Sequence, residues 1–309
     1  MKDVSFLVVN WNTKDVTDAC LRSLEEDCRG LDAETIVVDN GSTDGSMELI
    51  RSAHPGVRVI GNGENLGFAK ANNIGIRESR GEFLFLVNSD AVVLPGCTRR
   101  LIDCLRAEPR LAMLGPAVLD RDRRPQQSCW EFASLGSTLK ASIGLGQVDP
   151  CRAPLDNSRG YRSLRRHFLS GCALMVRRSA ADEVGMFDER FFFYGEDMDW
   201  CRRMLDAGWL IGQIPSATVI HYGGASTLTD GSGHLVQAER ALFQYLRKHG
   251  PWSVGIVRVV RLVHHLNRVL GTWLRTAVRR TERASAAAFR RRRRDVLRWL
   301  LDGEGVLHG

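Results

Sequence analysis

The sequence predicts an α/β protein whose mostly parallel sheet is covered by helices on both faces. Short apolar runs of β-favouring residues alternate with helical segments from the first residue onward. These runs are apolar throughout, as strands buried on both faces are. Polar residues stand where several of the runs end. Because ligands of such sheets bind outside the carboxyl ends of the strands, these polar residues mark the predicted site.

The expected elements follow one another in chain order. Strands are expected at 4–9, 35–39, 57–60, 82–88, 168–176, 209–214 and 217–222, with helices at 13–26, 68–78 and 195–207. The turn Asn40-Gly41-Ser42 can cap one more helix directly after it. Between 120 and 166 prolines interrupt the pattern, so loops and short helices are expected there.

Charge separates the body of the chain from its C-terminal tail. The 309 residues carry a net charge of +7, but residues 247–309 alone carry +11, which leaves −4 for residues 1–246. Basic and polar side chains recur there every three or four positions, at Arg258, Arg261, His265, Arg268, Thr272, Arg275 and Arg279. This spacing predicts a basic amphipathic helix in a tail that follows the main domain at residue 246.

The cysteines and the N-terminus favour a cytoplasmic protein. The eight cysteines contain no C-x-x-C pair, and we expect them to be reduced. The first apolar run ends at Asn10, which is too short for a membrane span or a signal peptide.

Two segments could bind a nucleotide. VVDNGSTDGS (37–46) places Asp39 at a strand end, where it could accept hydrogen bonds from a base or ribose, or belong to a plain capped turn. GNGENLGFAKANN (61–73) lies between a strand and a helix, so its backbone amides could hold phosphate. Its glycines are spaced one residue too widely for a dinucleotide fingerprint.

Three further segments could supply ligands or a base. Asn88-Ser89-Asp90 presents one carboxylate that could bind a hard divalent ion or cap a helix. YGEDMDWCRR (194–203) crowds Glu196, Asp197 and Asp199 at a helix start, where they favour the helix dipole or could include a general base. His221, at a strand end, could be structural or a metal ligand.

Taken together, these segments resemble family 2 glycosyltransferases, which are inverting enzymes of the GT-A fold. The nearest resemblance is to bacterial rhamnosyltransferases of cell-wall and O-antigen glycan assembly. It covers about residues 4–230 and rests on VVNWNT (8–13), VVDNGSTDGS (37–46), NLGFAKANN (65–73), VNSD (87–90), LSGCALMVRRSA (169–180), FDERFFFYGEDMDWCRR (187–203) and HYGGAS (221–226).

The resemblance implies a role for each matching residue. The donor-binding set is Asn12, Asp39, Ser42, Asn65, Gly67, Phe68, Asn72, Asn73 and Ser89. Asp90 and His221 would hold Mg²⁺ or Mn²⁺, and Asp197 would be the general base. Glu196, Asp199 and Trp200 would shape the acceptor site. Many relatives read Asn-Pro-Asp or Asp-x-Asp at 88–90, whereas Asn-Ser-Asp leaves a single carboxylate for the metal.

The resemblance also implies a reaction and a location. A dTDP- or UDP-linked sugar, with rhamnose from dTDP-rhamnose preferred, would pass to a glycan acceptor on a polyprenyl diphosphate lipid. Residues 1–110 would bind the donor and 111–246 the acceptor. The tail at 252–301 would contact the anionic inner face of the cell membrane, or instead pack on its own domain or in a homo-oligomer.

Other function classes explain less of the sequence. A NAD-type oxidoreductase conflicts with the glycine spacing. A nucleotide-sugar pyrophosphorylase would carry a glycine-rich loop with a basic residue near the first strand, and VVNWNT (8–13) contains neither. A non-enzymatic membrane or nucleic-acid scaffold leaves the acidic cluster at 196–199 and His221 unexplained. Nucleic acid is not expected as a partner, because no aromatic residues interleave Arg290–Arg294.

Overall fold

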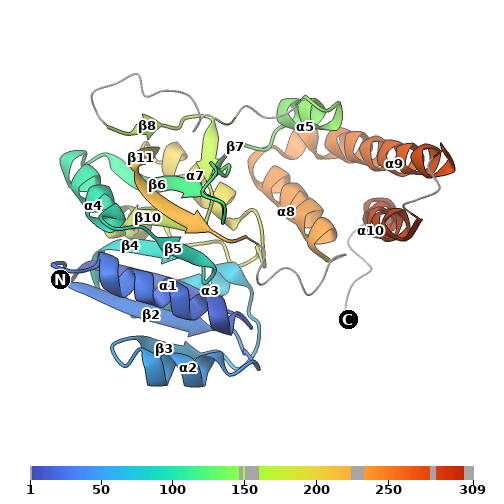
Figure 1. The fold of residues 1–309 in the computed structure, drawn as a ribbon. Helices are drawn as coiled ribbons and strands as arrows, with labels where there is room; N and C mark the ends of the chain where they lie inside the picture. Colours follow the sequence, from blue (N-terminus) through green and yellow to red (C-terminus); the bar gives the residue numbers. More distant parts are fainter. Residues whose placement is uncertain (1, 146–148, 150–159, 224–232, 279–282, 303–309) are drawn as a thin grey trace. The chain divides into compact units, whose positions relative to one another are not determined.

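The computed structural model describes residues 2–145, 149, 160–223, 233–278 and 283–302 (Figure 1). The chain forms two compact units. The first comprises Met1–Phe132 and Asp149–Ser226, and the second Ala133–Val148 and Thr227–Gly309. The domain boundary expected at residue 246 falls within the second unit and stays a prediction.

A mixed sheet is the framework of the first unit. Its described strands follow the order β3-β2-β1-β4-β10-β6-β11-β5, and β8 pairs with β11. They are β1 (Lys2–Asn10), β2 (Ala33–Asp39), β3 (Arg58–Gly61), β4 (Gly81–Val87), β5 (Ala91–Val93), β6 (Leu111–Leu119), β8 (Arg162–Ser163), β10 (Ala173–Arg177) and β11 (Leu210–His221). A two-stranded sheet joins β7 (Cys129–Glu131) to β9 (His167–Leu169). The predicted α/β class is confirmed, and the sheet expected to be mostly parallel is a mixed one whose strands β1 to β4 run parallel.

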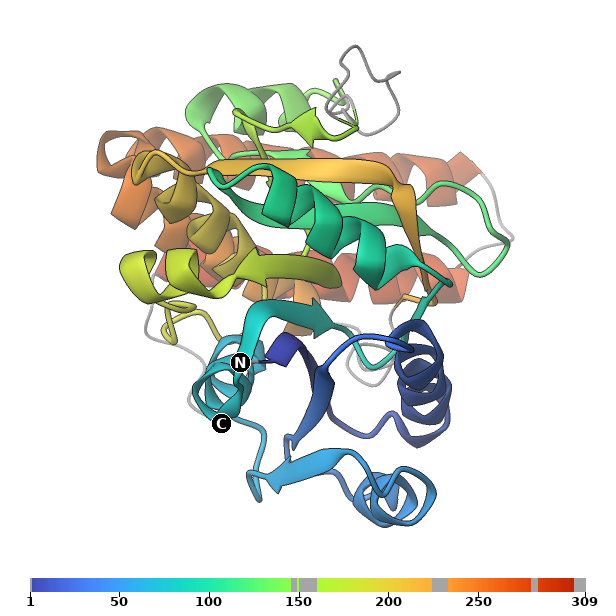
Figure 2. The same cartoon turned by 90° about the vertical axis from the view of Figure 1, so that its left-hand side faces the viewer.

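Helices cover both faces of this sheet (Figure 2). They are α1 (Lys14–Asp27), α2 (Ser46–Ala53), α3 (Phe68–Glu78), α4 (Cys97–Ala107), α6 (Arg178–Val184) and α7 (Glu196–Asp206). Alternate residues of β1 point to opposite faces, as in any strand. Phe6 and Val8 belong to the same buried cluster as residues of α1, α2 and α4, whereas Leu7 lies against Gly75 of α3.

The strand directions bring distant segments to one edge of the sheet. β1, β2, β3 and β4 run parallel, β10 is antiparallel to both β4 and β6, and β11 is parallel to β6. β11 therefore runs in the same direction as β1 and β4, and its carboxyl end lies at the same edge. Asn10, Asp39 and His221 end three of these strands.

Two expected strands have different boundaries in the structure. The runs 209–214 and 217–222 form the single strand β11, whose pairing with β6 shifts register between Ile214 and Thr218. Pro215 lacks the N–H that regular pairing needs, so the strand bulges there and continues. The run 168–176 is divided into β9 and β10, with Ser170, Gly171 and Cys172 between them.

Helix α4 and strand β6 were not predicted. In α4, the Thr-Arg-Arg stretch obscures the apolar face of the helix. The helix nevertheless buries Leu101, Ile102 and Leu105 against the sheet. The stretch 120–166 contains the short strands β7 and β8 and the helix α5 (Leu135–Ser142), consistent with the expected loops and short elements.

The expectation that every cysteine is reduced is wrong at Cys129, which is disulfide-bonded. Spacing along the sequence excludes only local C-x-x-C pairs and says nothing of cysteines that the fold brings together. The other described cysteines are free thiols, namely Cys20, Cys28, Cys97, Cys104, Cys172 and Cys201.

The second unit is helical. It contains α5, α8 (Gly233–His249), a short 3₁₀ turn (Pro251–Ser253), α9 (Val254–Val278) and α10 (Arg283–Asp302). Rings of Phe243 and Trp299 pack 5.6 Å apart and join α8 to α10. The predicted basic helix is α9, but its residues Arg261 and His265 are directed inward, toward Glu239 of α8. No helix among the described residues is long and apolar enough to cross a membrane.

Candidate functional site

Hydrogen bonds tie the loops after β1 and β2 together. The carboxylate of Asp39 accepts from the Asn10 side chain at 2.7 Å and from the Ser42 N–H at 2.9 Å. The N–H of Asn12 donates to the Ser42 hydroxyl at 2.9 Å, and the Asn12 side chain accepts from the N–H of Thr43 at 2.8 Å. The predicted donor residues Asn12, Asp39 and Ser42 therefore lie together, with Asp39 fully buried.

The glycine-rich loop before α3 is held on two sides. Asn40 donates its side-chain N–H to the Gly67 carbonyl at 3.1 Å, and Asn65 accepts from the Gly67 N–H at 3.0 Å. The N–H of Phe68 donates to the carbonyl of Phe192 at 2.7 Å, which attaches the loop to the segment before α7. Gly67 has φ +83, and a Cβ there would lie 2.5 Å from the Phe192 carbonyl oxygen, so only glycine fits.

Asn72 and Asn73 are buried and make structural contacts. The Asn72 side chain donates to the Phe68 carbonyl at 2.9 Å. Asn73 donates to the Phe187 carbonyl at 2.9 Å and accepts from the Phe187 N–H at 3.0 Å, while also donating to Glu189. These two residues position the loop and the segment 187–189, and their predicted contact with the donor remains untested.

Asp90 and His221 meet at the sheet edge. Nε2 of His221 lies 3.2 Å from Oδ1 of Asp90, and the Tyr222 N–H donates to the Asp90 carbonyl at 2.9 Å. The hydroxyl of Ser89 lies 2.9 Å from that of Thr13. Groups of three or more His, Cys, Asp or Glu side chains suited to a metal do not occur among the described residues.

Asp197 begins α7 beside the segment between β9 and β10. Its Oδ2 accepts from the Gly171 N–H at 3.0 Å, and its Oδ1 accepts from the Met198 N–H at 2.7 Å. A Cβ on Gly171 would lie 3.4 Å from the Phe68 ring and 3.7 Å from the Asp197 Cβ. Gly171 therefore stands between the glycine-rich loop and the carboxylate of Asp197.

The two neighbouring carboxyls of α7 hold protons more tightly than usual. Burial and then the charge of Asp197 raise the pKa of Glu196 well above its ordinary value. Burial also raises the pKa of Asp197, against the opposing effect of the Gly171 and Met198 N–H groups. Oε2 of Glu196 is buried without a hydrogen bond from any described residue. Such shifts are typical of carboxyls that exchange protons in a reaction.

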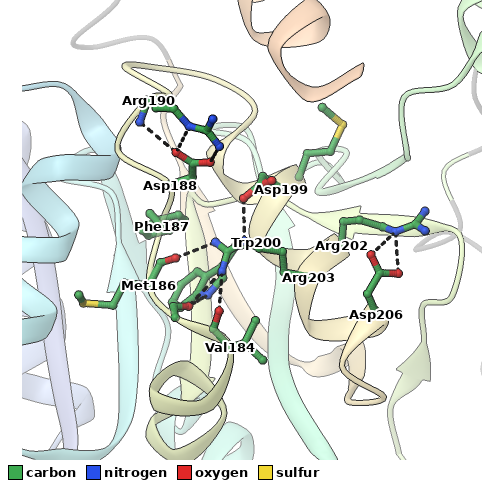
Figure 3. Close-up of polar contacts among 12 residues, drawn as sticks. Val184, Met186, Phe187, Asp188, Arg190, Asp199, Trp200, Arg202, Arg203 and Asp206 are labelled. Carbon is green, nitrogen blue, oxygen red and sulfur yellow. Dashed lines mark hydrogen bonds and ion pairs between the residues drawn. The ribbon is translucent and has the colours of Figure 1, made fainter. Parts of the chain in front are cut away.

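Asp199 and Trp200 anchor α7 in the fold (Figure 3). Both side chains are fully buried. Asp199 forms a 2.8 Å ion pair with Arg203, and the Trp200 indole N–H donates to the Gly185 carbonyl at 2.7 Å. Arg203 also donates to the carbonyls of Val184, Gly185 and Met186. Asp199 and Trp200 could therefore affect an acceptor only indirectly, by fixing the position of α7.

Asn10, Gly171 and Arg203 join the site although the sequence predicts no specific role for them. Asn10 ends an apolar run at the predicted edge of the sheet, and its side chain contacts both Asp39 and Ser42. Gly171 lies within a segment that carried the family resemblance, but its role depends on the distant Asp197. Arg203 gave no signal, because basic residues on exposed helix faces are common.

Comparisons with known proteins identify the family of this chain. The family model described as "Glycosyl transferase family 2" matches residues 5–185. The N-acetylglucosaminyl-diphospho-decaprenol L-rhamnosyltransferase of Mycobacterium tuberculosis is 34% identical over 236 residues, covering 70% of this chain and 76% of that protein. The dTDP-rhamnosyl transferase RfbF of Shigella flexneri is 26% identical over 264 residues, covering 82% of this chain and 84% of that protein.

The fold is also found in a solved glycosyltransferase. The mannosyltransferase PcManGT from Pyrobaculum calidifontis, determined in complex with GDP-Man and Mn²⁺, matches with a TM-score of 0.57 at 16% identity. The match covers 96% of this chain and 87% of that protein, which supports the predicted GT-A fold. Because the chain matches this family, its interpretation as an oxidoreductase, a pyrophosphorylase or a non-enzymatic scaffold is rejected. The chain belongs to glycosyltransferase family 2 and is a glycosyltransferase.

Proposed function

We propose that this enzyme transfers rhamnose from dTDP-rhamnose, with inversion, to a hydroxyl of a glycan carried by a polyprenyl diphosphate lipid in cell-wall glycan synthesis. Two relatives are rhamnosyltransferases by name, and the mycobacterial one is named for a diphospho-decaprenol acceptor. The observation that carries the proposal is the position of Asp197. Its carboxyl has a raised pKa and lies across Gly171 from the glycine-rich loop.

Asp197 acts as the general base. Its carboxylate takes the proton of the acceptor hydroxyl as that oxygen attacks the anomeric carbon from the face opposite the diphosphate. The bond between the anomeric carbon and the diphosphate oxygen breaks, and the nucleoside diphosphate leaves with the electron pair. A raised pKa makes the carboxylate a stronger base than an ordinary aspartate. The N–H groups of Gly171 and Met198 fix its orientation.

The pair Asp90 and His221 fits a divalent cation. Neighbouring ligands of one octahedral Mg²⁺ or Mn²⁺ ion lie roughly 3 Å apart, and the Asp90 oxygen and His221 nitrogen are 3.2 Å apart. A single carboxylate suits an ion that takes its remaining ligands from diphosphate oxygens and water. When bound, the ion would neutralise the negative charge that develops on the leaving diphosphate.

The two loops at the sheet edge bind the donor. Asn12 and Ser42 lie at the partly exposed surface of the first loop, where they contact the nucleobase, and buried Asp39 holds that loop in shape. Asn65, Gly67 and Phe68 present the glycine-rich loop to the ribose and diphosphate. Ser89 adds a hydroxyl from beside Thr13 of the first loop. Asn72 and Asn73 are buried and support this loop through hydrogen bonds to the carbonyls of Phe68 and Phe187. Glu196, Asp199 and Trp200 fix the side of the site that receives the acceptor.

A lipid-linked acceptor places the reaction at a membrane. We therefore place the enzyme in the cytoplasm, at the inner surface of the cell membrane. The composition of the tail agrees with this location, because residues 247–309 carry a net charge of +11.

Thermal unfolding tests the donor. The melting temperature would be measured with dTDP, UDP, GDP and NADH, each with and without Mn²⁺. A ligand that binds only the folded protein raises the melting temperature. At a ligand concentration one hundred times its Kd, the free energy of unfolding increases by about 2.7 kcal/mol. We expect dTDP to stabilise most and Mn²⁺ to enhance the effect. Stabilisation by GDP or UDP in preference to dTDP would overturn the rhamnose donor, and stabilisation by NADH alone would overturn the proposed function.

A further inference from the structure

Helix α9 exposes a continuous line of large apolar side chains, which we call the apolar stripe. Its members follow one another at spacings of four and three residues, so they lie along one side of the helix. The stripe comprises Trp252 at the end of the preceding turn, Ile256, Val259, Val263, Leu266, Leu270 and Trp273, with exposed fractions from 48% to 73%. Single exposed apolar residues are common, but a line of seven marks a binding surface.

The opposite side of α9 is occupied by contacts within the second unit. Val257 and His265 are fully buried. Nε2 of His265 lies 3.0 Å from the Glu239 carboxylate of α8, and Arg261 pairs with the same carboxylate. Nδ1 of His265 lies 2.7 Å from the Arg293 guanidinium of α10. These contacts fix the rotation of α9 about its axis, so the stripe from Ile256 to Leu270 faces away from α8 and α10, and Trp273 at its end contacts α10.

No negative charge borders the apolar stripe along α9. Its sequence from Val254 to Val278 contains arginines and histidines but no aspartate or glutamate. The guanidinium of Arg290 on α10 lies 4.4 Å from the centre of the Trp273 ring, which ends the stripe. Arg291, Arg292, Arg294 and Arg298 are exposed on α10. One cation therefore lies at the end of the stripe, and α10 exposes further cations.

We infer that the apolar stripe binds flat against an anionic lipid bilayer. The stripe from Trp252 to Trp273 extends about 33 Å along the helix at 1.5 Å per residue. This length allows many simultaneous contacts with the boundary between lipid headgroups and acyl chains. Tryptophans at both ends suit that interface, and arginine stems can extend to lipid phosphates. A second copy of the chain is disfavoured, because residues 247–309 carry a net charge of +11 and two such basic segments repel each other.

The inference deepens the proposed function, on which it rests only for the membrane location of the acceptor. Binding itself needs no sugar donor, and it can be measured without turnover. The full chain would be sedimented with phosphatidylglycerol vesicles and, separately, with neutral phosphatidylcholine vesicles. We expect binding to the first that is at least roughly tenfold tighter than to the second and that weakens with added salt.

Variants locate the surface. Val263→Gln/Leu266→Gln removes two apolar members of the stripe, and Arg291→Gln/Arg292→Gln removes two exposed cations. We expect the first to weaken vesicle binding at least roughly tenfold, and the second by roughly thirtyfold in the anionic vesicles. The control Arg51→Gln/Arg121→Gln removes two exposed arginines of the first unit and should bind as the unaltered chain does.

The outcomes separate this inference from its alternatives. If Val263→Gln/Leu266→Gln lost its circular dichroism, Ile256→Gln/Leu270→Gln would test the same surface. Vesicle binding that these variants leave unchanged would overturn the inference. So would a lipid-free oligomer that they dissociate, because the stripe would then bind a second copy. Normal vesicle binding in a protein that shows no dTDP stabilisation would support the inference while the proposed donor failed.

Discussion

Nε2 of His221 lies 3.2 Å from Oδ1 of Asp90 because strand β5 turns back and pairs with β11 directly after Asp90. Ala91 is opposite His221 in this antiparallel pair, and the Tyr222 N–H closes the end of it on the Asp90 carbonyl. Backbone pairing, and not only side-chain attraction, sets the separation of the two side chains. A site built in this way is preorganised for a shared ligand.

Removing either member of this pair should weaken binding of the divalent ion. We expect Asp90→Asn or His221→Gln to lower the affinity for Mn²⁺ in the presence of dTDP at least roughly tenfold. Electron paramagnetic resonance of free Mn²⁺ measures this directly. Asp122→Asn, an exposed carboxylate of the same unit, is the matched control. Unaltered Mn²⁺ affinity in both site variants would contradict the assignment of the pair.

Replacing the proposed base should separate catalysis from binding. Asp197→Asn keeps the shape of the side chain and an oxygen for the Gly171 N–H, but it cannot take a proton. We expect kcat to fall by about 10²–10⁴-fold, with stabilisation by dTDP unchanged. Asp206→Asn at the exposed end of the same helix is the control. Turnover that survived in Asp197→Asn would show that another group is the base.

The raised pKa of Glu196 predicts how stability depends on pH. A carboxyl whose pKa is higher in the folded state binds more protons folded than unfolded at intermediate pH. Its contribution to the free energy of unfolding is therefore largest at acidic pH and falls as pH rises from the ordinary glutamate pKa through the raised one. We expect Glu196→Gln to melt at a higher temperature than the unaltered protein at pH 8 and to lose this advantage at pH 4.

The control for this pH series is Glu64→Gln, because Glu64 is exposed. Its melting temperature should follow that of the unaltered protein at every pH. If Glu196→Gln instead lowered the melting temperature at pH 8, the Glu196 carboxylate would be stabilising in its charged form, and the assigned direction of its pKa shift would be incorrect.

The residues at the strand ends of the site could be predicted from the sequence, whereas the contacts of helix α7 could not. The positions of Asp39, Asp90 and His221 at one sheet edge follow from the alternation of apolar runs, because strand direction decides where such residues meet. The contacts of α7 do not follow. Successive residues point about 100° apart around a helix, so the sequence alone does not tell which of Glu196 to Trp200 face the crevice and which face the core.

The fold itself was predictable where strands are apolar throughout and less so elsewhere. The strands β1, β2 and β4 have continuous apolar runs, whereas α4 mixes arginines with its buried leucines. Pro215 divides one strand into two apparent ones, although the sheet tolerates it as a bulge. The faces of α9 were also not predictable, because burial of Arg261 and His265 depends on Glu239 in another helix.

The close contact at Gly67 makes it a sensitive position. An alanine there would place its Cβ 2.5 Å from the Phe192 carbonyl oxygen and would adopt a strained positive φ. We expect Gly67→Ala to destabilise the protein by roughly 1–3 kcal/mol and to abolish stabilisation by dTDP. Gly63→Ala, which also has a positive φ but no neighbour within 4 Å, controls for strain alone. Equal dTDP binding in the two variants would contradict the donor role of this loop.

The ion pair between Asp199 and Arg203 within α7 should control the position of the proposed base, Asp197. Arg203 is the partner of the fully buried Asp199 and holds three carbonyls of the segment 184–186. We expect Arg203→Gln to cost about 3–5 kcal/mol, because breaking a buried pair leaves the remaining charge poorly compensated. Asp199→Asn/Arg203→Gln removes both charges and should recover part of this loss, as urea unfolding would show.

Activity provides the second readout of this cycle. If the pair positions Asp197, the stable double variant should retain a reduced kcat with little change in donor KM, because the donor loops lie on other elements. Arg202→Gln, which breaks the exposed pair with Asp206 one position away, should alter neither stability nor kcat. A double variant with full activity would mean that the pair serves stability alone, and that the start of α7 is fixed instead by Gly171, whose N–H donates to Asp197.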